Sequence, residues 1–209
     1  MNAGGPIAGI AGSAARAKRA STWLVACWLA ALAVPGWAAT ADDDILVHAK
    51  KEGAEVVVEV DCPVWAPLRT VWDVLTDYDN MTSFISNLQY SAVQGRVDNV
   101  LKVRQSGKAA RGPLTITFDN VREVELRPFT EVRSRLISGD LKASAFTTRL
   151  VDLDGIVHII NSGRYTPKMW VPPLVGPALI EAETRKQFAE IRTEILRRSE
   201  RRAAELAPR

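Results

Sequence analysis

The side chains best suited to chemistry are few and widely spaced in this 209-residue sequence. Its two histidines are His48 and His158, and Cys62 precedes Pro63 with no histidine nearby in sequence. The sequence has no Cys and His grouping with metal-site spacing, no nucleophile elbow and no glycine-rich phosphate loop. We therefore expect both histidines to be ordinary strand residues rather than catalytic bases or ligands. Cys62 is expected to be a small buried side chain rather than a reactive thiol.

Charged side chains give equally modest signals. Asp77 and Asp79 stand two residues apart near the end of a predicted helix, where aspartate is more often a turn or capping residue than a general acid. Three arginines could hold a carboxylate or phosphate at a pocket mouth, although arginine in an alternating strand is usually exposed; they are Arg104, Arg111 and Arg149. The sequence predicts no catalytic residue, no cofactor and no metal, and it favours binding over catalysis without excluding an enzyme.

The first forty residues have the composition of an export signal. Residues 1–41 contain no Asp or Glu, three basic residues at positions 16–19, an uncharged apolar run over 23–34 and an A-x-A site ending at Ala41. This pattern predicts a signal peptide over 1–41, a mature domain over 42–209, and a periplasmic or secreted location. The apolar run is shorter than the roughly 20 residues that a bilayer requires, which disfavours a permanent anchor. A lipobox-like string ending at Cys27 is a further alternative.

Removal of this segment changes the composition of what remains. The formal net charge of +3 equals the three basic residues of the leader, so the mature chain is near neutral and a nucleic-acid partner is not expected. Cys27 would leave with the leader, so Cys62 has no cysteine in the mature chain to pair with. Residues 185–209 are rich in arginine, and a solvated helix face is favoured there over a surface that contacts membranes transiently.

Apolar periodicity predicts an α+β domain. Alternation indicates a strand pair over 45–50 and 54–61, and helical spacing indicates a helix from 68 to about 78 followed by a short helix or turn over 81–88. Six strands with short connections are expected over 88–94, 99–106, 114–125, 130–138, 143–153 and 156–165. A final helix after Pro177 carries one stripe formed by positions 180, 184, 188, 191 and 195. The expected order is a strand pair, helices, an antiparallel meander and a long helix.

One turn sets the cross-strand register. Asp154-Gly155 is a strong two-residue hairpin signal, and it places Leu150 opposite Ile159, Thr148 opposite Asn161 and Phe146 opposite Gly163. We expect these pairs on the concave face, with His158 pointing outward. The same rule across Gly139-Asp140 would set Arg133 opposite Phe146, which indicates a longer or bulged turn and leaves Arg133 and Arg135 without an assigned face.

The segment before the final helix is apolar and rich in proline. Residues 167–177 contain four prolines and Trp170, which stands two positions after Lys168. This composition indicates an ordered, non-helical strap. The strap is either a lid or membrane-contacting lip over a pocket, or a segment packed on the core, and the sequence supports both interpretations.

Two stretches carry a family resemblance. They are CPVWAPLRTVWDVLTDYDNMTSFISNL, residues 62–88, and GRYTPKMWVPPLVGPALIEAETRKQF, residues 163–188. The chain resembles the START-like superfamily, in particular its polyketide cyclase/dehydrase and coenzyme Q-binding branch, across almost all of residues 42–209. The resemblance implies a helix-grip fold, in which a curved antiparallel sheet wraps the C-terminal helix around an apolar tunnel. Thr148 replaces an aromatic residue and Ser86 a proline that are common in relatives, so a wider or more polar cavity is expected.

The sequence therefore predicts a protein that binds a small hydrophobic ligand, such as a lipid, isoprenoid or polyketide-like molecule, for sequestration or transport. The alternatives are a cyclase/dehydratase-type enzyme using the same pocket and a structural module with a fully packed core. Strand parity, the proline-rich strap and the final helix nominate nine ligand-binding residues: Leu101, Val103, Ile116, Phe118, Phe146, Thr148, Leu150, Trp170 and Phe188.

Overall fold

The computed structural model describes residues 44–111, 114–168 and 176–206, all of which belong to the unit 38–209. The predicted signal peptide and most of the proline-rich strap lie outside the described residues. The side chains of Ile116 and Arg111 are also not described.

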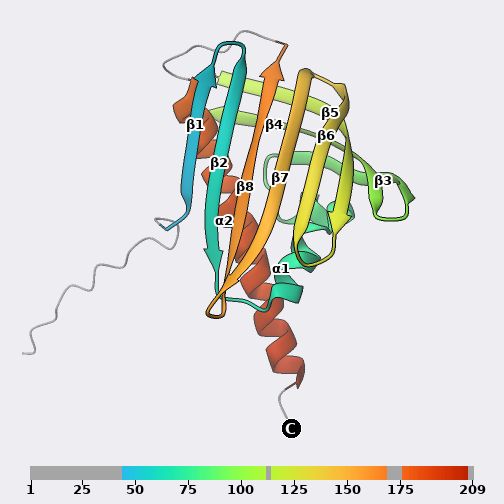
Figure 1. Cartoon of the computed structure of the whole chain (residues 1–209), viewed down its shortest axis with the longest axis vertical. Coiled ribbons are helices and arrows are strands. Elements are labelled where there is room, and N and C mark those ends of the chain that lie inside the picture. The colour runs from blue at the N-terminus through green and yellow to red at the C-terminus, as the bar shows by residue number, and fades with distance from the viewer. Residues whose placement is uncertain (1–43, 112–113, 169–175, 207–209) are drawn as a thin grey trace, which may run out of the picture. The chain divides into compact units, whose positions relative to one another are not determined.

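An antiparallel sheet of eight strands forms one layer of the fold (Figure 1). Its strands are β1 Leu46–Glu52, β2 Glu55–Val64, β3 Leu88–Val97, β4 Val100–Arg111, β5 Leu114–Arg127, β6 Glu131–Gly139, β7 Leu141–Leu153 and β8 Ile156–Pro167. Their order across the sheet is β1-β2-β8-β7-β6-β5-β4-β3, so the opening hairpin joins the end of the meander through the β2–β8 pair. The predicted strand pair and six-strand meander are confirmed.

The β7–β8 hairpin has the predicted register. Leu150 faces Ile159, Thr148 faces Asn161 and Phe146 faces Gly163. Both turn residues have positive φ, 53° at Asp154 and 86° at Gly155, as a type I′ turn requires. The short turn therefore fixed this register correctly.

The β6–β7 connection is longer than a two-residue hairpin. The two strands pair only from Glu131–Arg149 to Arg135–Ala145, and Gly139 instead pairs with Asn120 of β5. As a result, Ser134 rather than Arg133 lies opposite Phe146. The shift by one residue places Arg133 and Arg135 on the outer face, because side chains alternate along a strand.

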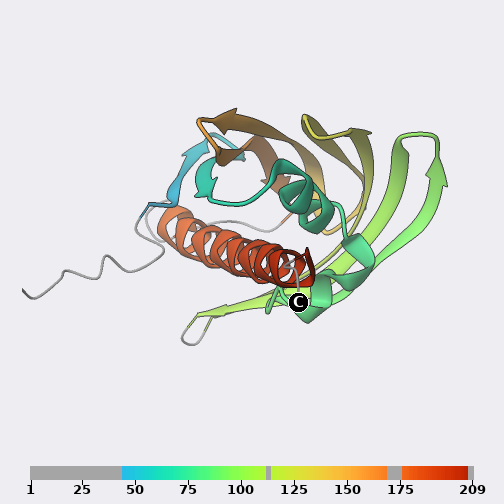
Figure 2. The same ribbon diagram turned by 90° about the horizontal axis from the view of Figure 1, so that it is seen from below.

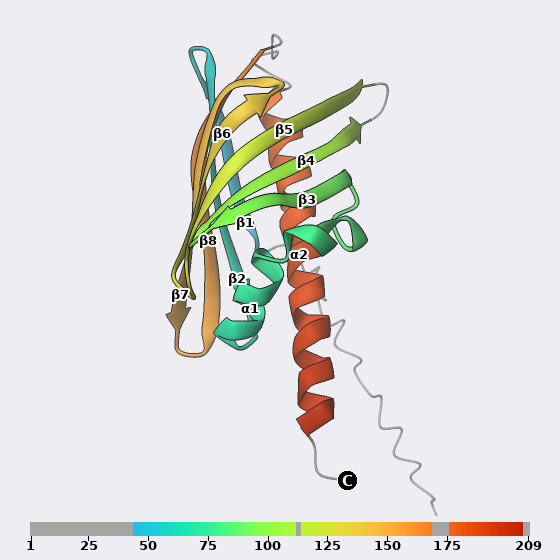
Figure 3. The same ribbon diagram turned by 90° about the vertical axis from the view of Figure 1, so that its right-hand side faces the viewer.

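Three helical segments accompany the sheet: α1 Leu68–Leu75, the 3-10 helix η1 Tyr78–Ser83, and α2 Gly176–Leu206. The sheet curls around α2, with α1 and η1 beside it (Figure 2). A side view shows α2 along the concave face, with its last turns extending past the strands (Figure 3). These helices match the predicted ones, although α1 ends at Leu75 rather than near Tyr78. At this end the Thr76 hydroxyl donates a hydrogen bond to the Trp72 carbonyl.

The core lies between the concave face and the helices. Val56, Val124 and Ile159 of the sheet are buried together with Val71 of α1 and Ile195 of α2. Cys62, on β2, is fully buried, as predicted for a small apolar side chain. None of the helices in the described ranges has the length and apolar character needed to cross a bilayer.

A group of ion pairs fastens α2 to the end of α1. The Glu194 carboxylate accepts hydrogen bonds from Arg197 and Arg198 at 2.6 Å, and Arg198 also pairs with Asp77 at 2.8 Å. The hydrogen bond from Arg197 is the largest of the influences that hold the pKa of Glu194 at about 2, below its ordinary value of 4.5. Asp77 therefore joins the end of α1 to α2 through an ion pair.

Glu194→Gln is expected to lower the free energy of unfolding at neutral pH by about 1 kcal/mol, a small value because Arg197 is half-exposed and water screens the pair. The lowered pKa means that this stabilisation is complete above pH 4.5 and is lost as the pH falls toward 2. In urea unfolding series, the difference from the native protein should shrink on acidification through this window. Glu200→Gln, at an exposed position of the same helix, is the control. A difference that does not change with pH would contradict the assignment.

Candidate functional site

A cavity of about 410 Å³ lies between the concave face of the sheet and α2. Apolar side chains from both layers form much of its wall: Val58, Val124, Val132, Ile180, Phe188 and Ile191. Small-molecule sites have volumes of about 300–1,000 Å³, so this cavity can accept a small ligand. The interior is therefore not a fully packed core.

Three of the nine predicted ligand-binding residues line this cavity. Phe146 and Thr148 contribute from β7 and Phe188 from α2. The strip of β7 nominated by hairpin parity therefore faces the space under the helix. Their contact with a ligand stays a prediction.

The other predicted residues lie elsewhere. Leu101, Val103 and Leu150 are buried in the packed core, and Phe118 packs partly buried against it, so none of these four borders the cavity. Strand parity identified their face correctly but cannot tell which positions on that face are covered by other side chains. The side chain of Ile116 and all of Trp170 are outside the described parts.

Polar side chains that the sequence interpretation missed also reach the cavity. Arg122 on β5 donates a hydrogen bond to the side-chain oxygen Oε1 of Gln105, and the Gln105 side-chain amide donates to the Ser91 hydroxyl at 3.0 Å. Ser91 in turn donates to the Tyr78 carbonyl at 2.5 Å. This chain of bonds links the sheet to η1 and leaves a guanidinium group at the cavity wall.

Arg122 is partly exposed and borders the cavity, and its Nε atom is buried. Desolvation lowers the pKa of its guanidinium, which remains charged because arginine titrates far above neutral pH. A sequence signal did exist, because Arg122 shares the strand parity of Phe118, which was assigned to the concave face. The usual exposure of arginine on strands hid it.

Two tyrosines border the same space. Burial raises the pKa of both Tyr78 and Tyr165 to about 12, so both phenols remain protonated at neutral pH. Their hydroxyls can donate hydrogen bonds but cannot act as bases under those conditions. The carbonyl oxygens of the Asn87 and Asn161 side chains are buried at the wall without a hydrogen-bond partner. The site thus offers donors and acceptors along an otherwise apolar wall.

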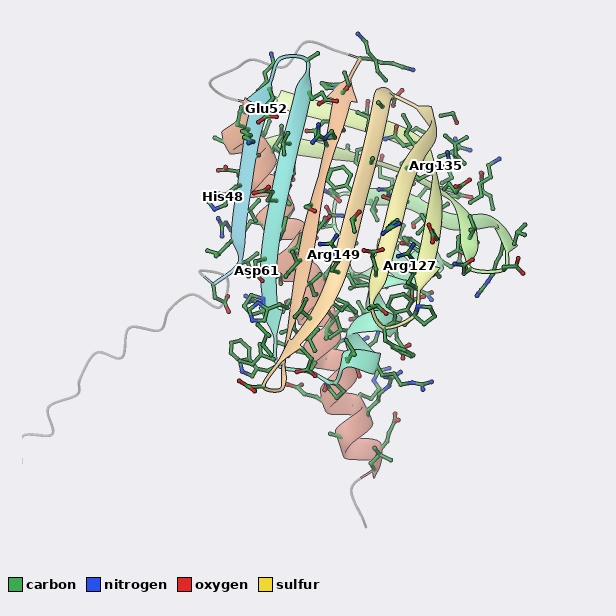
Figure 4. All side chains as sticks on the ribbon, in the orientation of Figure 1. His48, Glu52, Asp61, Arg127, Arg135 and Arg149 are labelled. Atoms are coloured by element: carbon green, nitrogen blue, oxygen red, sulfur yellow. The ribbon has the colours of Figure 1, made fainter. Side chains whose placement is uncertain are left out.

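The convex face carries the paired charges. Arg104 pairs with Asp119, Arg135 with Glu123, and both Arg133 and Arg149 with Glu131. Figure 4 labels Arg127, Arg135 and Arg149 on the face turned away from α2. The sequence allowed Arg104 and Arg149 either a place at a pocket mouth or an exposed position. In the structure both form ion pairs on the surface.

The two histidines and Asp79 lie on strands or at η1, and the contacts described for His158 and Asp79 are with residues of neighbouring elements. His158 points outward, as predicted, with Nδ1 2.8 Å from Asp61, and His48 is exposed on β1. Asp79 accepts a hydrogen bond from the Val93 amide at 2.7 Å and so ties η1 to β3. Among the described residues no group of three or more His, Cys, Asp or Glu side chains could hold a metal ion.

Two other hollows are larger but lie on the surface. One, of about 550 Å³, runs over β5 to β8 and contains Glu123 and Arg135, which pair with each other. The other, of about 680 Å³, follows the outer side of α2 near Phe84 and Lys186. Neither hollow lies between the sheet and α2, whereas the cavity under α2 has apolar walls from both layers together with Arg122. The cavity under α2 is therefore the candidate site.

An antiparallel sheet wrapped around a C-terminal helix, with a cavity between them, defines a helix-grip protein of the START-like class. The polyketide cyclase / dehydrase and lipid transport family matches residues 64–187 of this chain. The chain belongs to that family, and the predicted resemblance and fold are confirmed. No protein of curated function matches it in sequence.

Solved structures agree on the fold. A Zhui aromatase/cyclase from Streptomyces sp. R1128 superimposes with a TM-score of 0.57 at 16% identity, covering 71% of this chain and 96% of that one. A STAR-related lipid transfer protein fragment from Xanthomonas axonopodis gives 0.56 at 13% identity, over 73% and 99%. A protein from Thermus thermophilus gives 0.59 at 14% identity, over 68% and 99%. At these identities the similarity shows the fold alone.

Proposed function

We propose that this protein is exported and binds one small hydrophobic molecule in the cavity under α2, for sequestration or transport. The observation that carries the proposal is the cavity of about 410 Å³, whose apolar walls come from both the sheet and α2. Burying apolar ligand surface contributes about 25 cal/mol per Å², so a single lipid or isoprenoid chain could bind there with few polar contacts. Similarity to both a lipid-transfer protein and a cyclase fits a cavity of this kind.

Export rests on the composition of residues 1–41. Expression in a bacterial host followed by mass spectrometry of the periplasmic or secreted fraction tests it. A mass corresponding to a chain that starts near Asp42 is expected. An unprocessed chain retained in the cytoplasm would refute this part of the proposal and leave ligand binding unaffected.

Thr148→Phe should weaken binding of the neutral apolar dye N-phenyl-1-naphthylamine by about tenfold or more, because the introduced phenyl ring fills part of the cavity. Thr147→Phe is the matched control, since Thr147 stands one position away on the opposite face of the same strand. Fluorescence titration gives both affinities, and the control should bind like the native protein. Equal weakening in both variants would place the dye outside the cavity.

A second candidate function is a cyclase/dehydratase-type enzyme, and one observation favours it. Several polar side chains converge on the cavity, among them Arg122, Gln105 and Tyr165. Catalysis by proton transfer works best with a group that titrates near neutral pH, and the described lining contains no histidine, while burial keeps both of its phenols protonated. We therefore favour binding. The carrier and the enzyme can be distinguished by incubating the protein with a ligand that co-purifies with it and then measuring the mass of that ligand. A carrier leaves the ligand chemically unchanged, whereas an enzyme converts it.

A further inference from the structure

Arg122 is a partly buried cation whose charge no described carboxylate matches. Its Nη2 donates to Gln105, its Nε is buried without a hydrogen-bond partner, and no described acidic side chain forms an ion pair with it. Glu183 of α2 borders the same cavity but lies beyond ion-pair distance of Arg122. A charge removed from water without a partner is costly, because the protein interior solvates an ion less well than water does.

The contrast with other strand arginines makes this position stand out. On β4, β6 and β7 the outward arginines whose side chains the structure describes each have a carboxylate partner, as in the Arg104–Asp119 pair at 2.6 Å. Arg122 is on the same sheet with its side chain directed to the inner face, where its neighbours are an amide and a phenol. A negatively charged molecule in the cavity could supply the missing counter-charge.

The surroundings of Arg122 have the features of an anion site. A guanidinium group presents a planar fork of donors that matches a carboxylate or a phosphate, and hydrogen bonds to charged groups are the stronger ones. The Tyr78 phenol, kept protonated by burial, borders the same space and can donate a further bond. Apolar residues such as Val124 and Ile191 continue the wall away from this polar end. The volume suits a molecule with a single hydrocarbon chain.

We propose that the ligand is a single-chain amphiphile with one anionic head group, a carboxylate or a phosphate monoester, held by Arg122 while its hydrocarbon chain lies along the apolar wall. This inference rests on the proposed function, since it requires a ligand in the cavity. It adds the chemical class of that ligand and the residue that selects it.

The test compares three probes that share one chain: dodecanoate, dodecyl phosphate and 1-dodecanol. Each probe is titrated against the purified protein loaded with N-phenyl-1-naphthylamine, at probe concentrations below the probe's own aggregation limit, and displacement of the dye is measured. At least one of the anionic probes is expected to bind about tenfold to a hundredfold more tightly than the alcohol, the size of effect that one charge-assisted contact provides. Whichever anion binds more tightly identifies the head group.

Arg122→Met should remove this preference and leave 1-dodecanol binding within about twofold, because methionine keeps an apolar side chain of similar length. Arg122→Lys keeps the charge without the fork and should retain part of the preference. Arg104→Met, on the convex face and outside the cavity, should retain the full preference. Thermal unfolding of each variant verifies that it is folded.

The outcomes separate the inference from the proposed function. Equal affinities of the three probes for the native protein, or a preference that survives in folded Arg122→Met, would overturn the anionic head group while leaving hydrophobic binding intact. If no probe displaces the dye and the dye itself does not bind, the proposed function fails and the inference fails with it.

Discussion

Gly163→Ala is expected to lower the free energy of unfolding by about 3 kcal/mol, and the melting temperature by about 6–12 °C for a domain of this size. A Cβ at this position would lie 2.4 Å from the Ala145 carbonyl oxygen and 2.4 Å from the Phe146 ring. Strand β8 cannot move away, because Gly163 is paired with Phe146 on one side and with Val58 on the other. Glycine is needed here for space, and the added atom would strain both pairings.

Differential scanning calorimetry measures this loss, with Gly95→Ala as the matched control. Gly95 is also a strand glycine, but an added Cβ there meets nothing within 4 Å, so its melting temperature should stay close to that of the native protein. In the double variant Phe146→Ala/Gly163→Ala the ring no longer opposes the methyl group. The double variant should therefore lose less stability than the sum of the two single losses. A Gly163→Ala protein that melts like the native one would show that Phe146 does not lie over this glycine.

The second large effect is a gain in stability. Replacing Arg122 by methionine and Gln105 by leucine together should raise the free energy of unfolding by about 2 kcal/mol, because buried charged groups are often less stabilising than apolar ones of similar size. Both positions change because Arg122→Met alone would leave the side-chain oxygen of Gln105 without its donor. Urea unfolding of the ligand-free protein gives the value.

Arg104→Met is the control for this gain. Arg104 is exposed and paired with Asp119, and water screens exposed pairs, so the stability of this variant should differ little from that of the native protein. A double variant that is less stable than the native protein would mean that Arg122 supports the fold itself. The expected gain together with the expected loss of anion preference is the pattern of a residue retained for function at a cost in stability.

Local patterns in the sequence determined most of the secondary structure. The Asp154-Gly155 turn fixed the β7–β8 register, since a two-residue turn leaves no freedom in pairing. The spacing of Phe188, Ile191 and Ile195 identified the buried stripe of α2. The family resemblance supplied the arrangement of these elements, which periodicity alone could not have done.

Only the tertiary structure decided which inward residues meet a cavity. Leu150 and Thr148 share one strand face, but Leu150 is covered by packed side chains and Thr148 borders open space. That difference depends on how α2 lies over the sheet, which involves residues far apart in sequence. The one-residue shift between β6 and β7 also arose from pairing with a third strand, through Gly139 and Asn120.

Arg122 illustrates the division most clearly. The sequence determined its face through strand parity, because side chains alternate along β5. Its burial, its bond to Gln105 and the absence of an ion pair with any described carboxylate were decided only when β4, β5, η1 and α2 came together. Whether a charge meets a counter-charge depends on residues that only the folded chain brings together, and a linear pattern does not contain that information.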